Sequence, residues 1–170
     1  MNLVNRVAQS GLITLNLEQY YPENELLIFD LKDYLFKEMI LREKDFRAAL
    51  KEIKWEDYQN TILLVHCSTD AIIPMWAYML VASYAEPFCT DIYVGNKNEY
   101  LNHYYKNKID ALAIEPYIDQ KIVIKGCSGK PVPTGAYQYL TSRLRPFAKS
   151  IMFGEPCSTV PIYKQPMKRK

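Results

Sequence analysis

The chain of 170 residues lacks the glycine patterns that mark nucleotide-binding proteins. It has six glycines, and no Gly-x-Gly-x-x-Gly segment occurs. The segment Gly126-Cys127-Ser128-Gly129-Lys130 is similar to the end of a phosphate-binding loop, but the first glycine of that motif is absent. Pro131 also stands where the motif needs Ser or Thr. Phosphate binding of either kind is therefore discounted.

Long apolar runs and an excess of one charge are missing too. No apolar run approaches the roughly 20 residues needed to cross a bilayer, and the first residues lack the apolar stretch of a signal peptide. The net charge is +2, which is too balanced to predict nucleic-acid binding. We therefore expect a cytoplasmic protein that binds neither membrane nor nucleic acid, with its four cysteines mostly reduced.

The composition is that of a globular protein. Apolar residues make up 49% and charged residues 24% of the chain, close to the average for folded domains. We predict a single α/β domain over residues 1–164 and a basic flexible tail over 165–170. The 14 tyrosines are unusual and suit a partner surface as well as the edge of a core.

One stretch of the sequence is written twice. Two apolar runs end in Cys67-Ser68 and in Cys127-Ser128, and each is followed by a short loop and a proline that begins a helix. From that proline onward the copies share eight identities at a constant spacing of 133 − 74 = 59: Pro74/Pro133, Ala77/Ala136, Tyr78/Tyr137, Ser83/Ser142, Pro87/Pro146, Phe88/Phe147, Ile92/Ile151 and Gly95/Gly154. We interpret 61–95 and 121–154 as two copies of a β-loop-α-β unit.

Strands that alternate with helices predict a mainly parallel sheet. Leu12–Leu17 and Glu25–Phe29 alternate well enough to be strands, and we expect them to form an N-terminal hairpin at the sheet edge, followed by a helix over Leu31–Ile40. The predicted helix Met75–Ala85 is apolar nearly all round. Such a helix is covered on two sides, here by the sheet and by the N-terminal region or another subunit.

Three thiols are expected at one edge of this sheet. Cys67 and Cys127 directly follow predicted strands, and Cys157 comes shortly after a third. Because parallel strands end on the same edge, the three side chains are expected to converge there. Three thiolates suit zinc or an iron–sulfur cluster. The candidates for a fourth ligand are His66, Asp70, Glu155, water or a residue of a partner.

Other interpretations of the thiols stay open. Buried structural cysteines at tight strand exits explain the pattern equally well. A small cysteine-dependent enzyme is a further alternative, since Lys125 or Lys130 would lower the pKa of Cys127. His66 adjoins Cys67 within a strand, however, so their side chains point to opposite faces. We interpret Cys89 as structural, and a non-catalytic, dimeric interaction module is the third alternative.

Four stretches resemble one family along almost the whole chain. They are Asn5–Leu15, Leu41–Arg47, Lys125–Ser128 with Pro131-Val132-Pro133, and Gly154–Pro161. The chain resembles the family known as domain of unknown function 2480, whose Cys-Ser motifs match the three cysteines. Some members carry a label likening them to tungsten formylmethanofuran dehydrogenase, for whose catalytic machinery this chain is far too short. Others are linked by gene neighbourhood to iron–sulfur cluster assembly. The resemblance thus implies an accessory role in metal or cluster handling, with iron–sulfur assembly proteins as partners.

Overall fold

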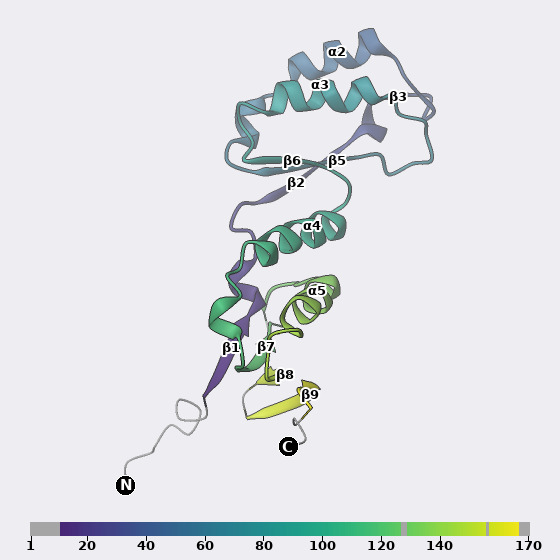
Figure 1. The fold of residues 1–170 in the computed structure, drawn as a ribbon. Helices are drawn as coiled ribbons and strands as arrows, with labels where there is room; N and C mark the ends of the chain where they lie inside the picture. Colours follow the sequence, from purple (N-terminus) through teal and green to yellow (C-terminus); the bar gives the residue numbers. More distant parts are fainter. Residues whose placement is uncertain (1–10, 127–128, 156, 167–170) are drawn as a thin grey trace. The chain divides into compact units, whose positions relative to one another are not determined.

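The computed structural model describes residues 11–126, 129–155 and 157–166. The chain divides into two compact units: unit 1 comprises residues 1–21 and 101–170, and unit 2 comprises residues 22–100. The predicted α/β class is confirmed, because the sheet of unit 2 is parallel and that of unit 1 is mostly parallel (Figure 1). Within the described residues, no helix is both long enough and apolar enough to span a membrane.

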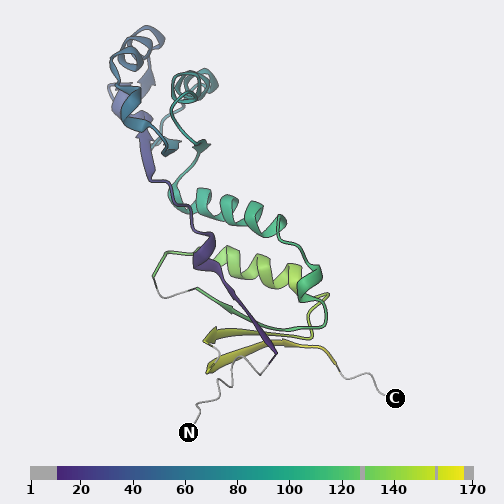
Figure 2. The same ribbon diagram turned by 90° about the vertical axis from the view of Figure 1, so that its left-hand side faces the viewer.

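Unit 1 is built on a sheet with the strand order β1-β7-β8-β9. Its elements in chain order are β1 (Leu12–Asn16), the 3-10 helix η1 (Leu17–Tyr20), α4 (Lys97–Asp110, begun in unit 2), η4 (Glu115–Tyr117), β7 (Lys121–Lys125), α5 (Thr134–Leu144), β8 (Ser150–Glu155) and β9 (Ser158–Lys164). The first three strands of the sheet are parallel, and β9 runs antiparallel to β8. Figure 2 shows α5 lying over one face of this sheet.

The core of unit 1 follows from two periodicities in the sequence. Ile122 and Ile124 alternate along β7 and point to the helix side, because side chains in a strand alternate between faces. Ala136, Leu140 and Leu144 recur every four residues along α5 and form its buried stripe. Tyr105 and Ile109 of α4 complete this cluster and are fully or almost fully buried.

Unit 2 has the same plan, with the strand order β2-β5-β6. Its elements in chain order are β2 (Leu26–Asp30), η2 (Leu31–Tyr34), β3 (Leu35–Phe36), β4 (Ile40–Leu41), α2 (Glu43–Glu52), η3 (Trp55–Tyr58), β5 (Ile62–His66), α3 (Met75–Ala85) and β6 (Asp91–Val94). Helices α2 and α3 lie on the same face of the sheet (Figure 1). Phe46 and Leu50 of α2 share one core with Ala77 and Val81 of α3.

The predicted repeats have matching element bounds at the spacing of 59, except that β8 runs two residues further than β6. Strand β5 begins at Ile62 and β7 at Lys121; helix α3 begins at Met75 and α5 at Thr134; strand β6 begins at Asp91 and β8 at Ser150. Each copy is a β-loop-α-β unit, as predicted. The two copies lie in separate sheets, one in each unit.

The predicted N-terminal hairpin is wrong. Strands β1 and β2 do not pair with each other; β1 runs parallel to β7, and β2 runs parallel to β5. Each strand ends in a side-chain cap that begins a 3-10 helix: the Asn16 side chain accepts from the Glu18 N–H at 3.1 Å, and the Asp30 side chain accepts from the Lys32 N–H at 3.0 Å. These turns carry the chain away instead of reversing it into a hairpin. Each unit therefore gains its own first strand.

The predicted helix over Leu31–Ile40 is also wrong. Only Leu31–Tyr34 is helical, as η2, and a short antiparallel β3–β4 hairpin follows. The turn of this hairpin places Lys37 and Glu38 at φ of 51° and 60°. A right-handed helix cannot continue through such left-handed backbone. The sequence pattern did not indicate this turn.

Candidate functional site

The carboxyl edge of the sheet in unit 2 is organised by Asp30. This residue lies at the end of β2, directly opposite His66 at the end of β5. One carboxylate oxygen accepts the N–H groups of Lys32 and Ser68, both at 3.0 Å. Burial acts to raise the pKa of Asp30, but the hydrogen bonds from Ser68 and Lys32, together with the charge of His66, outweigh it and leave the pKa below its ordinary value. The carboxylate therefore ties the loop after β5 to β2.

The predicted thiols fall in different parts of the chain. Cys67 follows β5 in unit 2, is half-buried and packs against the core of that unit. Cys157 is exposed between β8 and β9 in unit 1, and Cys127 lies outside the described residues. In the described ranges no group of three or more His, Cys, Asp or Glu side chains is arranged to hold a metal ion. The convergence of the three thiols stays a prediction.

The predicted fourth ligands have varied surroundings. Glu155 forms an ion pair with Lys125, whose Nζ lies 2.9 Å from Oε2 across β7 and β8. Asp70 is exposed on the loop before α3, beside Ile72. His66 is half-buried, and Asp30 stands opposite it in the sheet. The Lys125–Glu155 pair was not predicted from the sequence, because the register in which β7 and β8 pair cannot be read from it.

The dipeptides Cys67-Ser68 and Cys127-Ser128 do not occupy corresponding positions in the two repeats; they are shifted by one residue. The strands β5 and β7, the helices α3 and α5, and the register of the β5–β6 and β7–β8 pairs correspond at the spacing of 59. Because 67 + 59 = 126, Cys67 corresponds to Gly126, and Cys127 corresponds to Ser68. Gly126 has φ of 138°, and a Cβ there would lie 3.2 Å from the backbone nitrogens of Leu17 and Glu18. The close approach of η1 therefore favours glycine at this position of unit 1.

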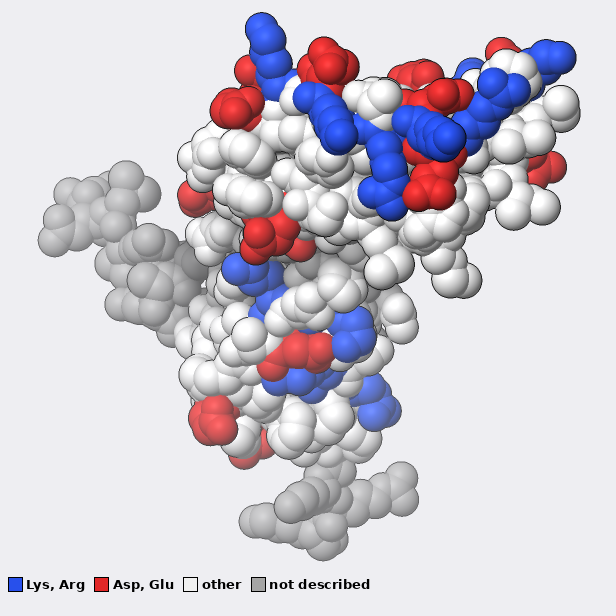
Figure 3. Space-filling model, turned by 90° about the horizontal axis from the view of Figure 1, so that it is seen from above, with Lys and Arg blue, Asp and Glu red and all other residues white. Residues whose placement is uncertain are grey.

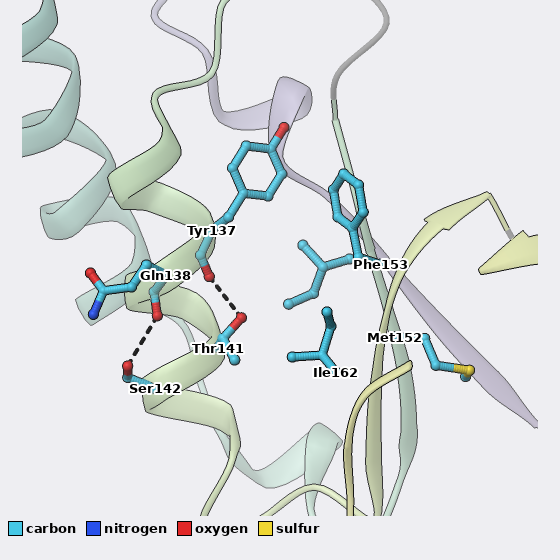
Figure 4. Close-up of a pocket in the computed structure, with 8 residues that line it drawn as sticks. Tyr137, Gln138, Thr141, Ser142, Met152, Phe153 and Ile162 are labelled. Carbon is cyan, nitrogen blue, oxygen red and sulfur yellow. Dashed lines mark hydrogen bonds between the residues drawn. The ribbon is translucent and has the colours of Figure 1, made fainter. Parts of the chain in front are cut away.

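Unit 1 contains a pocket of about 370 Å³ between α5 and the strands β8 and β9 (Figure 4). Its lining is mostly apolar: Ile124, Tyr137, Gln138, Thr141, Ser142, Met152, Phe153 and Ile162. Such a volume and lining are typical of small-molecule sites. A second hollow of about 500 Å³ shares Tyr137 and Phe153 with the first and reaches Lys130 on the loop before α5.

Two aromatic rings stand where the two hollows meet. Tyr137 and Phe153 pack edge to face with ring centroids 5.7 Å apart. The Tyr137 hydroxyl donates to the carbonyl oxygen of Gly126, which fixes the ring at the end of β7. This hydrogen bond and the ring contact hold the junction at the carboxyl edge of the parallel strands, where open α/β sheets usually bind ligands.

The polar groups of the pocket come from one face of α5. The Thr141 hydroxyl donates to the Tyr137 carbonyl at 2.8 Å, and the Ser142 hydroxyl donates to the Gln138 carbonyl at 3.0 Å (Figure 4). Both hydroxyl hydrogens are thereby used within the helix, and their oxygens retain lone pairs that can accept. Among the described residues that line the two hollows, Lys130 is the only charged one.

Strand β9 builds the far wall of the pocket, and this strand was not predicted from the sequence. Ile162 of β9 lines the pocket opposite α5. A signal was present in Val160-Pro161-Ile162-Tyr163, an apolar run just after Gly154, although Pro161 weakens it as a strand. Unit 2 has no equivalent of β9, since β6 is the last strand of its sheet.

Charged side chains do not gather into a patch of one sign in the view of Figure 3, where Lys and Arg lie among Asp and Glu. Helix α2 shows the pattern locally: Arg47 Nε lies 2.9 Å from Glu43 Oε1, and Arg42 pairs with Asp45 at 3.9 Å. Such exposed pairs contribute little to stability.

Comparison with known proteins identifies the family. A family model described as "Protein of unknown function (DUF2480)" matches residues 1–165. The chain belongs to this family. No curated protein and no solved structure matches it. The resemblance inferred from the sequence motifs is thus confirmed, and DUF2480 membership by its description carries no activity.

Proposed function

We propose that unit 1 binds a small molecule with an apolar body and one anionic group in the pocket beside α5. The observation that carries this proposal is the difference between the two repeats. Unit 1 has added β9, and Ile162 of that strand encloses a groove that unit 2 leaves without a wall. An added strand that walls an apolar groove leading toward the carboxyl edge of a sheet, where Tyr137 and Phe153 stand, is the expected design of a binding site.

The lining defines the class of ligand. Ile124, Phe153 and Ile162 offer only apolar contacts, which favours an aromatic or aliphatic body. Lys130 in the adjoining hollow favours a carboxylate or another anion at the end of the ligand.

Isothermal titration calorimetry with naphthalene-2-carboxylate tests this proposal, with the neutral naphthalene-2-carboxamide as comparator. We expect Ser142→Phe, which places a ring at the exposed rim of the pocket, to weaken binding at least about tenfold. Ser83→Phe is the matched control: Ser83 corresponds to Ser142 in unit 2 and likewise donates from its hydroxyl to a carbonyl of its own helix. Lys130→Gln should reduce the preference for the carboxylate over the carboxamide.

The outcomes separate clearly. Equal losses in Ser142→Phe and Ser83→Phe would place binding elsewhere and refute the pocket. Loss in Ser142→Phe alone, with no change of preference in Lys130→Gln, would retain the pocket and refute the anionic end. No heat of binding from either probe would count against the whole proposal.

The second proposal keeps the thiol hypothesis. Cys67, Cys127 and Cys157 would bind zinc or an iron–sulfur cluster, and iron–sulfur assembly proteins would be the partners. It is supported by the position of both described members, since Cys67 and Cys157 follow the carboxyl ends of the parallel strands β5 and β8. In unit 1, Lys125 already pairs with the candidate ligand Glu155.

Anaerobic purification with metal and sulfide analysis tests the thiol proposal. We expect bound metal in the wild-type chain and its loss in Cys157→Ser. Cys89→Ser is the control, because Cys89 packs against the core of unit 2 and lies outside the Cys-Ser motifs. A metal-free wild-type chain that gains nothing on reconstitution would refute the proposal.

A further inference from the structure

Unit 2 carries a strip of exposed apolar residues along α3 and β6. Ile72, Met75, Met79 and Val94 are 92%, 85%, 71% and 59% exposed. At the spacing of 59 these four correspond to Pro131, Thr134, Gln138 and Phe153, all of which line the two hollows of unit 1. The strip is therefore the unit 2 counterpart of the groove that β9 walls in unit 1.

The strand beside this strip has an open edge. β6 is the last strand in the order β2-β5-β6, whereas its counterpart β8 is paired on the outer side with β9, antiparallel. In the ranges the structure describes, no strand pairs with the outer edge of β6. An uncovered edge beside apolar side chains is a template for a further strand.

Helix α3 lacks the polar residues that its counterpart carries. From Met75 to Ala85 it has no charged residue. Met75 and Met79 occupy the positions of Thr134 and Gln138 in α5 and expose their side chains. Methionine is common on surfaces that bind other proteins, and contiguous exposed apolar side chains mark such a surface. The all-apolar helix expected from the sequence to be covered on two sides has one side uncovered within unit 2.

We propose that a second copy of the chain covers this strip. In the dimer β6 pairs antiparallel with the β6 of the other copy, so that the two sheets of unit 2 become one continuous sheet. A twofold axis perpendicular to the sheet makes this pairing antiparallel, which is the direction that β9 takes on β8. It also places both α3 helices on the same side of the sheet, with their methionine faces opposed.

Charge and area favour a second copy as the occupant. Antiparallel pairing puts the Asp91 carboxylates of the two copies at opposite ends of the joined strands, so like charges do not meet. The Asp91 carboxylate also accepts a hydrogen bond from Tyr100 at 3.1 Å. The four residues together expose a contiguous, largely apolar surface, and strand pairing adds the main chain of β6 toward the roughly 800 Å² per partner that stable interfaces bury.

Sedimentation velocity of the full chain over a range of concentrations tests the dimer, since the monomer has a mass of 19.9 kDa. We expect a concentration-dependent dimer and at least about tenfold weaker association in Met79→Glu, which places carboxylates face to face. Ile28→Glu is the control: Ile28 is 62% exposed in the same unit but lies on β2, at the opposite edge of the sheet from β6. Concentration-dependent amide-exchange protection of residues 91–94 should accompany the dimer.

Each result decides the matter. A wild-type monomer at all concentrations would overturn the proposal and leave the edge to an extended segment of another protein. A dimer that Met79→Glu leaves unchanged, or that Ile28→Glu weakens equally, would place the interface elsewhere. A dimer without added protection of residues 91–94 would overturn the strand pairing. Loss in Met79→Glu alone, with protection of these residues in the wild type, supports it.

Discussion

The Tyr105 hydroxyl donates a hydrogen bond of 3.0 Å to the backbone carbonyl of Leu17, although 88 residues separate them. Both residues are fully buried, and the bond joins α4 to the turn after β1 within unit 1. Burial, with Tyr21, Tyr104 and Glu18 nearby, raises the pKa of Tyr105 far above its ordinary value, so the hydroxyl stays protonated and donates at all ordinary pH values. The N-terminal strand is thereby fixed to a helix from the second half of the chain.

We predict that Tyr105→Phe lowers the free energy of unfolding by about 1–3 kcal/mol, because the Leu17 carbonyl is left buried without its donor. Chemical denaturation followed by circular dichroism measures the change. Tyr163→Phe in the same unit is the control. The Tyr163 ring packs beneath Arg145 and is only half-buried, so removing its hydroxyl leaves no buried carbonyl without a donor among the described residues. A loss of less than 0.5 kcal/mol in Tyr105→Phe would contradict the assignment.

Asp30 gives a prediction about pH. Its folded pKa lies below the ordinary value of about 3.9. The carboxylate therefore stabilises the fold fully above about pH 4, and this contribution is lost as the pH falls through the lower folded pKa. Urea titrations from pH 7 to pH 2 should show the advantage of the wild type over Asp30→Asn disappearing in that acid range.

The size of the Asp30 effect separates charge from hydrogen bonding. Asp30→Asn keeps an oxygen that can accept from Lys32 and Ser68, as Asn16 does for Glu18 in unit 1. We expect it to cost less than about 1 kcal/mol at pH 7, whereas Asp30→Ala should cost about 1–2 kcal/mol by removing the cap. Equal costs, or a difference from the wild type that is constant from pH 7 to pH 2, would argue against this role.

The repeats could be predicted because their signals are local. An apolar run, a loop and a proline at the first turn of a helix are read within 35 residues, and Pro74 and Pro133 do immediately precede α3 and α5. Strand pairing is not local in this way. Leu12–Asn16 pairs with Lys121–Lys125, more than 100 residues later, and the sequence of neither strand indicates which strand it pairs with. The nearer strand, Glu25–Phe29, was therefore predicted as the partner of Leu12–Leu17, and this hairpin prediction was wrong.

The pocket escaped prediction for a related reason. Its walls come from α5, β7, β8 and β9, and the side chains that line it are ordinary core types such as Ile124 and Phe153. What makes them a site is the strand that encloses them, which is a property of packing rather than of composition. A thiol site, by contrast, could be hypothesised from the sequence, because the chemistry of cysteine is distinctive wherever the residue occurs.

Arg143 is predicted to stabilise the end of α4. Its guanidinium donates to the carbonyls of Asp110 at 2.9 Å and of Leu112 at 3.1 Å. A cation there complements the negative end of the helix dipole. Arg143→Lys cannot reach both carbonyls with the same planar fork and should cost about 1 kcal/mol in thermal or chemical unfolding.

Arg145→Lys is the matched control for Arg143. It lies two residues further along, is exposed, and stacks over the Tyr163 ring at 4.8 Å. We expect a change below about 0.5 kcal/mol there. Two equal effects would show that the helix end gains nothing specific from Arg143.

The cysteines should differ in reactivity. Burial raises the pKa of the Cys89 thiol, although a hydrogen bond with Thr61 opposes this. Cys157 is exposed between β8 and β9. Iodoacetamide labelling of the reduced, metal-free chain near pH 7.5, followed by mass spectrometry, should modify Cys157 at least about tenfold faster than Cys89. In about 8 M urea, which unfolds most small domains, the labelling rates of Cys157 and Cys89 should converge. Faster labelling of Cys89 in the folded chain would contradict the burial seen here.

Gly154 links the stability of the β8–β9 pair to the pocket. Its φ is +119°, and a Cβ there would lie 2.7 Å from the carbonyl oxygen of Ser158. Gly154→Ala should therefore cost roughly 1–3 kcal/mol and loosen β9, so that binding of naphthalene-2-carboxylate weakens together with stability. Gly129→Ala is the control, because a Cβ at Gly129 would lie at an ordinary 3.6 Å from a side-chain oxygen of Glu18. If Gly154→Ala lost stability yet bound the probe as the wild type does, β9 would not be the wall on which the site depends.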